Sequence, residues 1–214
     1  MNYYNFFIDK EVWVIRIMEL NRMGIIFYLH IIERNRMELS YTREEALEKL
    51  LRAYQSSYNI EAADPSMDPL VNVCHFYQHT SKYVMSRKAE LWSADTTEHV
   101  YIFSVPNLTT EIYKSCEKLA YEQGMELIDP KPGHMCTYIT AVFLCDSYTD
   151  EALKLLKKCK LFKSFHFSLR GWMDFHSVAI NLPKEEIFHN RSGHSTAKIL
   201  KKILYKQKKG RIRL

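Results

Sequence analysis

The sequence predicts an α+β fold, a single domain in which helices pack against a mixed β-sheet. Four segments have helical periodicity and open on capping residues, and strand-like alternation fills the segments between them. The stretch 136–145 is apolar nearly throughout, which is typical of a central strand covered on both faces. The elements follow in the order αβββαβαββα, and no repeat or linker divides them.

The first part of the predicted domain contains one helix and three strands. Thr42 and Glu45 form a capping box, and apolar residues at helical spacing extend this helix over about 42–58. Three stretches then have strand-like character: residues 70–77, 83–92 and 99–105. The polar stretch 93–98 is expected to connect the last two of these strands.

Three further helices complete the predicted domain. One begins at Thr109 or Thr110, both of them N-capping residue types, and Gly124 ends it. The next begins at Thr149, with acidic residues in its first turn and lysines in its last, as the helix dipole favours. A terminal helix begins near Ser195.

The segment 163–176 predicts a β-hairpin with two unlike faces. A three-residue loop at 170–172 keeps apolar and polar residues apart, whereas a two-residue loop would mix them, so we expect the three-residue loop. The apolar face, expected to be buried, consists of Phe165, Phe167, Leu169 and Phe175. The polar face consists of His166, Ser168, Asp174 and His176.

This polar face is the best candidate site in the sequence. Two imidazoles and a carboxylate are ligands that divalent metals accept, so His166, Asp174 and His176 are candidate metal ligands. A divalent metal is accordingly the one cofactor that the sequence suggests. The alternative is that these side chains simply meet solvent or a neighbouring helix.

The stretch Phe165-His-Phe-Ser-Leu169 also resembles the strand motif of the two-histidine phosphoesterases, in which each histidine acts on the phosphate beside a hydroxyl. This resemblance implies that His134, His166 and Ser168 are catalytic candidates. Cys136 stands where the second copy of the motif requires Ser or Thr, so the pattern is incomplete.

The predicted αβββα opening resembles the core of restriction-endonuclease-like nucleases. Lys88-Ala-Glu90 reverses the Glu-x-Lys order of that family, which implies at most a degenerate relative that binds nucleic acid. No glycine-rich phosphate loop and no nucleophile elbow occurs in the sequence. Whether the protein is an enzyme is left open.

The basic character of the chain is concentrated at its C-terminus. The net charge is +5, but residues 195–214 contain eight Lys or Arg and no acid, so the remainder carries −3. We expect a basic tail at 206–214 and an anionic partner, either nucleic acid or an acidic protein. Candidate contacts are Lys201, Lys202, Lys206, Lys208, Lys209, Arg211 and Arg213.

The sequence also predicts boundaries and a compartment. We expect one domain at 37–205, with residues 1–36 as an extension that an upstream start codon would add, because Met37 precedes the first capping box. No apolar stretch is long enough to span a bilayer. Five cysteines without C-x-x-C spacing indicate reduced thiols and a cytoplasmic protein.

Over residues 82–193 the chain is similar to a family of uncharacterised bacterial proteins. The matching residues are Lys82–Trp92, Glu98–Tyr101, His134, Met135, Thr140, Lys163–Phe165, Gly171, Trp172 and the turn Asn190–Gly193. The resemblance implies a domain that begins near Met37 and supplies no mechanism. We therefore expect a binding or accessory domain. The alternatives are a phosphoesterase or metal-dependent hydrolase that uses the hairpin, and a nucleic-acid-binding protein.

Overall fold

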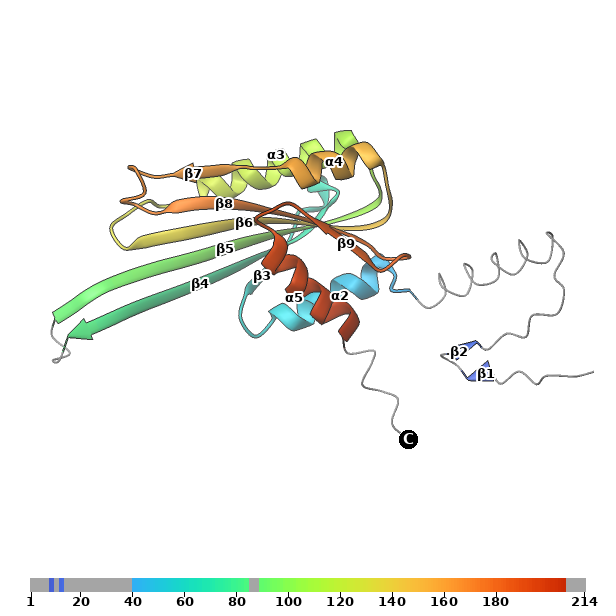
Figure 1. Ribbon diagram of the computed structural model, residues 1–214, viewed down its shortest axis with the longest axis horizontal. Helices are drawn as coiled ribbons and strands as arrows, with labels where there is room; N and C mark the ends of the chain where they lie inside the picture. The colour runs from blue at the N-terminus through green and yellow to red at the C-terminus, as the bar shows by residue number, and fades with distance from the viewer. Residues whose placement is uncertain (1–7, 10–11, 14–39, 85–88, 207–214) are drawn as a thin grey trace, which may run out of the picture. The chain divides into compact units, whose positions relative to one another are not determined.

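The computed structural model describes residues 8–9, 12–13, 40–84 and 89–206, with side chains from 40 to 80 and from 94 to 206. Contacts group the chain into two units, Met1–Ser40 and Tyr41–Leu214. In the first unit, β1 (Ile8–Asp9) and β2 (Val12–Trp13) pair antiparallel. The second unit contains a mixed sheet with helices on both faces, which confirms the predicted α+β class (Figure 1).

The sheet of the second unit has seven strands in the order β3-β4-β5-β6-β8-β7, with β9 also pairing with β8. The strands are β3 (Asn59–Ala62), β4 (Leu70–Val84), β5 (Ala89–Leu108), β6 (His134–Tyr148), β7 (Phe162–Ser164), β8 (Trp172–Asn181) and β9 (Glu186–His189). Strands β3, β4 and β5 form an antiparallel meander. Strands β5, β6 and β8 are parallel, and β7 and β9 return antiparallel to β8.

Four helices pack on this sheet: α2 (Arg43–Tyr54), α3 (Thr110–Glu126), α4 (Asp150–Lys158) and α5 (His194–Tyr205). The predicted capping box is present, because the Thr42 hydroxyl accepts from the Glu45 amide while the Glu45 carboxylate accepts from the Thr42 amide. Of the two candidate caps for α3, Thr109 is the one used, and Thr149 caps α4 as expected.

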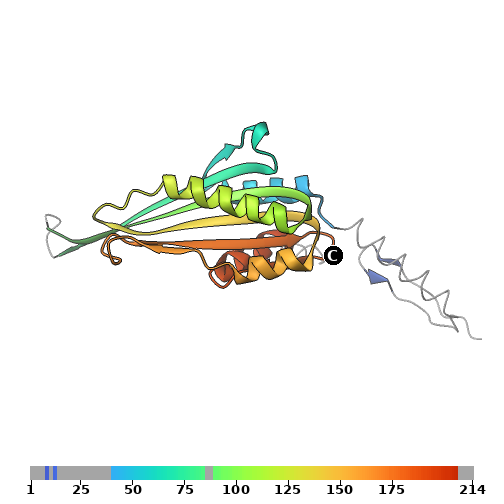
Figure 2. The ribbon, with the colours of Figure 1, turned by 90° about the horizontal axis from the view of Figure 1, so that it is seen from above.

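The helices divide into two layers, with α3 and α4 on one face of the sheet and α2 and α5 on the other (Figure 2). Strand β6 alternates between the two layers. Ile139, Ala141 and Phe143 face α3 and α4, whereas Val142 and Leu144 face α2 and α5. Helices therefore cover both faces of β6, which explains why its sequence is apolar almost without interruption.

Two expectations for the first half of the domain are wrong, the connection at 93–98 and the end of a helix at Gly124, and one strand was not predicted. The predicted connection at 93–98 lies inside β5, because this polar stretch continues the ladder with β4. The short polar strand β3 was not predicted, since its residues are mostly exposed. Gly124 does not end α3; it lies inside the helix, where a Cβ atom would come within 2.7 Å of the Ile139 side chain. The glycine allows α3 to pack closely on the sheet.

The predicted hairpin register is also wrong. The ladder pairs Lys163 with Met173 and ends at Ser164 opposite Trp172, so residues 165–171 form a turn instead of a strand. Phe175 is buried as expected and Phe165 is half-buried, but Phe167 is 98% exposed. Leu169 is likewise 83% exposed. Residues 166–168 have positive φ angles, which no extended strand can contain.

Asn190 holds the chain between β9 and α5 against the sheet. Its buried side-chain oxygen accepts from the backbone amides of Ser177 and Gly193 at 3.1 and 2.8 Å. Its amide group donates to the carbonyls of Cys159 and Phe175 at 3.2 and 2.8 Å. All four hydrogen bonds that the side chain can form are made. They fix the position at which α5 begins.

Two histidines of the antiparallel meander, His75 and His99, approach each other with their Nδ1 atoms 2.7 Å apart. One nitrogen must donate and the other must accept, so the contact requires an unprotonated Nδ1 on one ring. Burial, and secondly the nearby His75, lower the pKa of His99 from 6.5 to about 4. His99 is the ring that stays neutral.

The unfolded chain therefore binds a proton at His99 between pH 6.5 and about 4, whereas the folded chain does not. Stability is expected to fall as the pH falls through this window, by about 3 kcal/mol in total. In urea unfolding from pH 7 to pH 4.5, His99→Gln should lose stability less steeply than the wild type. His166→Gln, a change in the exposed turn, should keep the wild-type slope. An unchanged slope in His99→Gln would contradict this assignment.

Candidate functional site

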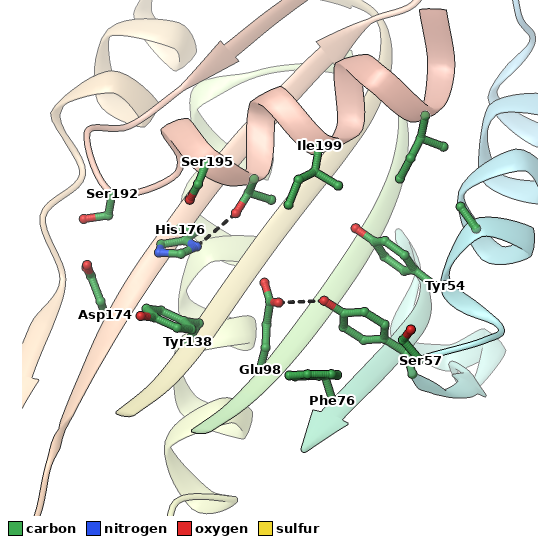
Figure 3. A pocket seen from close by; sticks show the side chains of 14 residues that line it. Tyr54, Ser57, Phe76, Glu98, Tyr138, Asp174, His176, Ser192, Ser195 and Ile199 are labelled. Carbon is green, nitrogen blue, oxygen red and sulfur yellow. Dashed lines mark hydrogen bonds between the residues drawn. The ribbon is translucent and has the colours of Figure 1, made fainter. Parts of the chain in front are cut away.

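A pocket of about 630 Å³ opens on the face of the sheet that carries α2 and α5. The two helices cover only the part of the face where Val100, Val142 and Val178 are buried. Towards the start of β6 and β8, the same face continues beyond the C-terminal end of α2 and the N-terminal end of α5. The pocket lies there, over side chains that point to the same face of the sheet as Val100, Val142 and Val178 (Figure 3).

The floor of the pocket is one row of side chains across three strands. Glu98 on β5 pairs with Tyr138 on β6, which pairs with Asp174 on β8. Phe76 on β4 lies opposite Glu98 and extends the row. Because neighbouring strands are about 4.8 Å apart, the two carboxylates project from positions about 10 Å apart, with the Tyr138 ring between them.

The next row inward forms a chain of hydrogen bonds. The Tyr58 hydroxyl donates to one oxygen of Glu98 at 2.7 Å, and the Thr140 hydroxyl donates to the other at 2.8 Å. His176 Nδ1 lies 3.1 Å from the hydroxyl of Thr196 on α5 and 3.5 Å from that of Thr140. These contacts connect Tyr58, in the segment between α2 and β3, to the start of α5 through side chains of β5, β6 and β8.

The hydrogen-bond chain favours one tautomer of His176. Thr140 gives its only proton to Glu98, so its oxygen can contact His176 only as an acceptor from an Nδ1–H group. Nε2 then carries a lone pair and has no hydrogen-bond partner among the described residues. It faces the side of the pocket where Asp174 and Ser192 lie (Figure 3).

The ionisation states around His176 follow from burial. Burial lowers the pKa of His176, and the carboxylates of Glu98 and Asp174 offset this only in part, so the ring is neutral at pH 7. Burial and the charge of Glu98 raise the pKa of Tyr58 far above its ordinary value. Tyr58 is therefore a permanent hydroxyl donor to Glu98.

The pocket is acidic and aromatic. Its lining residues are Ala53, Tyr54, Ser57, Tyr58, Phe76, Glu98, Tyr138, Asp174, His176, Ser192, Ser195, Thr196, Ile199 and Ile203. No Lys or Arg is among these residues, all of which belong to the described part of the chain. Asp174 has neither a hydrogen bond nor an ion pair with any described residue. Its carboxylate is available to a bound molecule.

The structure brings together two of the three residues predicted as metal ligands. Asp174 and His176 both line the pocket, but His166 lies in the exposed turn beyond the end of β7. The predicted register would have set His166 opposite His176, whereas Thr140 of β6 pairs with His176. No group of three or more His, Cys, Asp or Glu among the described residues is placed to hold a metal ion.

The three residues predicted as catalytic do not form a site with one another. His134 is buried, and both its nitrogens have partners, the Arg170 carbonyl at 2.7 Å and the Thr137 hydroxyl at 2.9 Å. It holds the turn after β7 against the start of β6. His166 and Ser168 are exposed in that turn.

The remaining predicted contacts are partly outside the described residues. Lys201, Lys202 and Lys206 are exposed on or just after α5. Lys208, Lys209, Arg211 and Arg213 lie outside the described residues, as do Lys88 and most of the segment 1–36. No helix in the described part of the chain is long and apolar enough to cross a membrane.

Sequence reasoning missed the residues that other elements contribute, namely the lining residues Tyr58, Glu98, Tyr138 and Thr196 and their hydrogen-bond partner Thr140. A signal for three of them is present. On each of β5, β6 and β8, polar residues on the pocket face are followed along the strand by apolar ones, as in Asp174, His176, Val178 and Ile180. This pattern becomes visible only once the three strands are aligned.

Comparison with known proteins identifies the family of the chain and nothing more specific. No curated protein and no solved structure matches it. One family model matches residues 42–202, a range that contains every residue lining the pocket except Ile203. The chain therefore belongs to the family described as Domain of unknown function (DUF8052).

Proposed function

We propose that this protein is a binding domain whose pocket takes a small organic cation. The observation that carries the proposal is the composition of the pocket, which combines two carboxylates with four aromatic rings and no cationic side chain. The volume of about 630 Å³ is within the range of small-molecule sites. A lining of this kind favours a positively charged ligand and disfavours a phosphate or carboxylate.

The two carboxylates have different tasks in this proposal. Glu98 is already held by Tyr58 and Thr140, so it contributes negative charge from a fixed position. Asp174 has no partner in the described residues and would pair directly with an ammonium group. The Tyr138 ring between them stacks on the His176 ring, with centroids 4.9 Å apart, and would meet the cation with its other face. The unprotonated Nε2 of neutral His176 would accept an N–H bond and would not repel the ligand.

Three probes with the same ring and different charges test the proposal: benzylamine, benzyl alcohol and benzoate. In calorimetric titrations of the full chain, benzylamine should bind about tenfold more tightly than benzyl alcohol, and benzoate should not bind measurably. Asp174→Asn should remove most of the preference for the amine without loss of stability, because no internal contact of Asp174 is broken. Asp129→Asn, a change in an acid on the α3–β6 loop, is the matched control.

Equal affinity for the amine and the alcohol would contradict the proposal. A divalent metal is the second candidate occupant, since Asp174 and the free Nε2 of His176 lie in the same pocket. Zinc or manganese should then raise the melting temperature of the wild type, and His176→Ala should abolish that rise. This result would favour the metal-dependent hydrolase over the cation-binding domain.

We also propose a reducing compartment, such as the cytoplasm. All five cysteines are buried and free in the structure, which supports this proposal. The acidity of the pocket gives no support to nucleic-acid binding there. An anionic partner would have to contact the exposed lysines of α5 instead.

A further inference from the structure

The turn that joins β7 to β8 and the adjoining end of β7 expose large apolar side chains that do not pack in the core. Phe167 is 98% exposed and Leu169 is 83% exposed, while Phe162 on the adjoining β7 is 61% exposed. None of the three belongs to either hydrophobic core. A protein of this size gains by burying such residues, so their position in water requires an explanation.

The backbone of this turn is built to hold them there. His166, Phe167 and Ser168 all have left-handed φ angles, which are unfavourable for residues other than glycine. Inside the turn, the Phe165 amide donates to the Gly171 carbonyl at 2.9 Å, and the Arg170 amide donates to the Phe165 carbonyl at 3.1 Å. Internal hydrogen bonds therefore hold the backbone of the turn, and Phe167 and Leu169 lie at its exposed tip.

Neighbouring elements support the base of the turn. His134 contacts the Arg170 carbonyl through Nδ1, and its ring packs edge-on against Phe165. Gly171 has a φ of +79°, and a Cβ there would come within 2.4 Å of the Met135 carbonyl oxygen. The base of the turn is thus fixed against the start of β6, while its tip carries no contact with the core.

The sequence segment that contains the turn carries charges of one sign. Residues 152–173 contain six Lys or Arg and no Asp or Glu, and two of these cations, Lys163 and Arg170, are at the base of the turn. Acids on neighbouring segments have partners or line the pocket. Asp129 pairs with Lys131, Asp95 is bound by Tyr77 and His79, and Asp174 faces the pocket.

We propose that this turn docks on the surface of an anionic lipid bilayer. Phe167 and Leu169 would enter the interface between headgroups and acyl chains, and Lys163 and Arg170 would contact lipid phosphates. A lipid surface fits better than a folded partner, because a stable protein interface needs about 800 Å² on each side and the apolar tip is two side chains on a seven-residue turn. The docking is peripheral and is independent of the pocket.

Cosedimentation of the full chain with vesicles tests this proposal. Binding to phosphatidylcholine vesicles with about 30% phosphatidylserine should exceed binding to pure phosphatidylcholine, and it should weaken as salt is added. The double change Phe167→Ser and Leu169→Ser should lower the partition coefficient about tenfold or more. The melting temperature should not change, because both side chains are exposed.

Two further variants separate the contributions. Lys163→Gln with Arg170→Gln should weaken binding and flatten its salt dependence. Leu127→Ser, which removes a leucine 52% exposed at the end of α3, is the matched control and should bind as the wild type does.

Three results would overturn the proposal. Vesicle binding that survives the double serine change would assign it to other cations, such as the basic tail. Equal binding to neutral vesicles would remove the role of charge. A lipid-free dimer of the wild type that the double serine change dissociates, seen by sedimentation velocity, would make the turn an interface between two copies.

Discussion

Replacing Asn190 by alanine is expected to lower the free energy of unfolding by about 4 kcal/mol or more. The change removes four hydrogen bonds and leaves two backbone amides and two carbonyls without their partner. The site is buried, so water cannot replace the lost partners, and each orphaned group costs about 1–3 kcal/mol. Urea unfolding at pH 7 measures the effect.

Asn181 provides the matched control. It is buried to the same extent, but its side chain makes only two hydrogen bonds, one to the Asp146 carbonyl and one from the Lys184 amide. Asn181→Ala should therefore cost about half as much as Asn190→Ala. Equal losses would show that Asn190 does not have the central position inferred for it.

The second large effect is expected at Phe175. This side chain is fully buried between the sheet and the layer formed by α3 and α4, so Phe175→Ala should cost about 3–5 kcal/mol. Phe167→Ala, the same chemical change in the exposed turn, should cost less than about 0.5 kcal/mol. Thermal and urea unfolding of the two variants measure this contrast.

The comparison also decides between two registers. In the hairpin predicted from the sequence, both phenylalanines lie on one buried face, and the two variants would lose similar stability. In the structure, Phe167 is 98% exposed and Phe175 is fully buried. A large loss in Phe167→Ala would therefore contradict the turn at 165–171 and favour the predicted hairpin.

The parts of the fold that local chemistry determines could be predicted from the sequence. Thr42, Thr109 and Thr149 each accept a hydrogen bond from a backbone amide three residues later, an interaction that depends only on near neighbours. The apolar stretch of β6 was predictable because both its faces are covered.

Elements that depend on distant partners could not be predicted. The segment Phe165–Leu169 alternates like a strand. However, β8 pairs with β6 along one edge, and at this end only the three residues of β7 pair with its other edge. The polar residues 93–98 have the composition of a loop, because a strand with one solvent-exposed face has a similar composition. Only the ladder with β4 distinguishes the two.

The candidate site was half predictable for the same reason. Asp174 and His176 were identified because they alternate with buried residues on one strand. Glu98 and Tyr138 join them through the parallel pairing of β5, β6 and β8, whose register is set by contacts more than thirty residues apart in sequence. No local pattern connects them.

The pocket takes one side from α2 and the segment just after it, with Tyr54 and Tyr58, and the other from α5, with Thr196 and Ile199. During synthesis, a ribosome-bound chain that has emerged only as far as β9 has the floor of the pocket and one of its sides. Such a nascent chain should not bind the proposed organic cation. Ligand binding would thus appear only at the end of folding, after α5 has left the ribosome and docked.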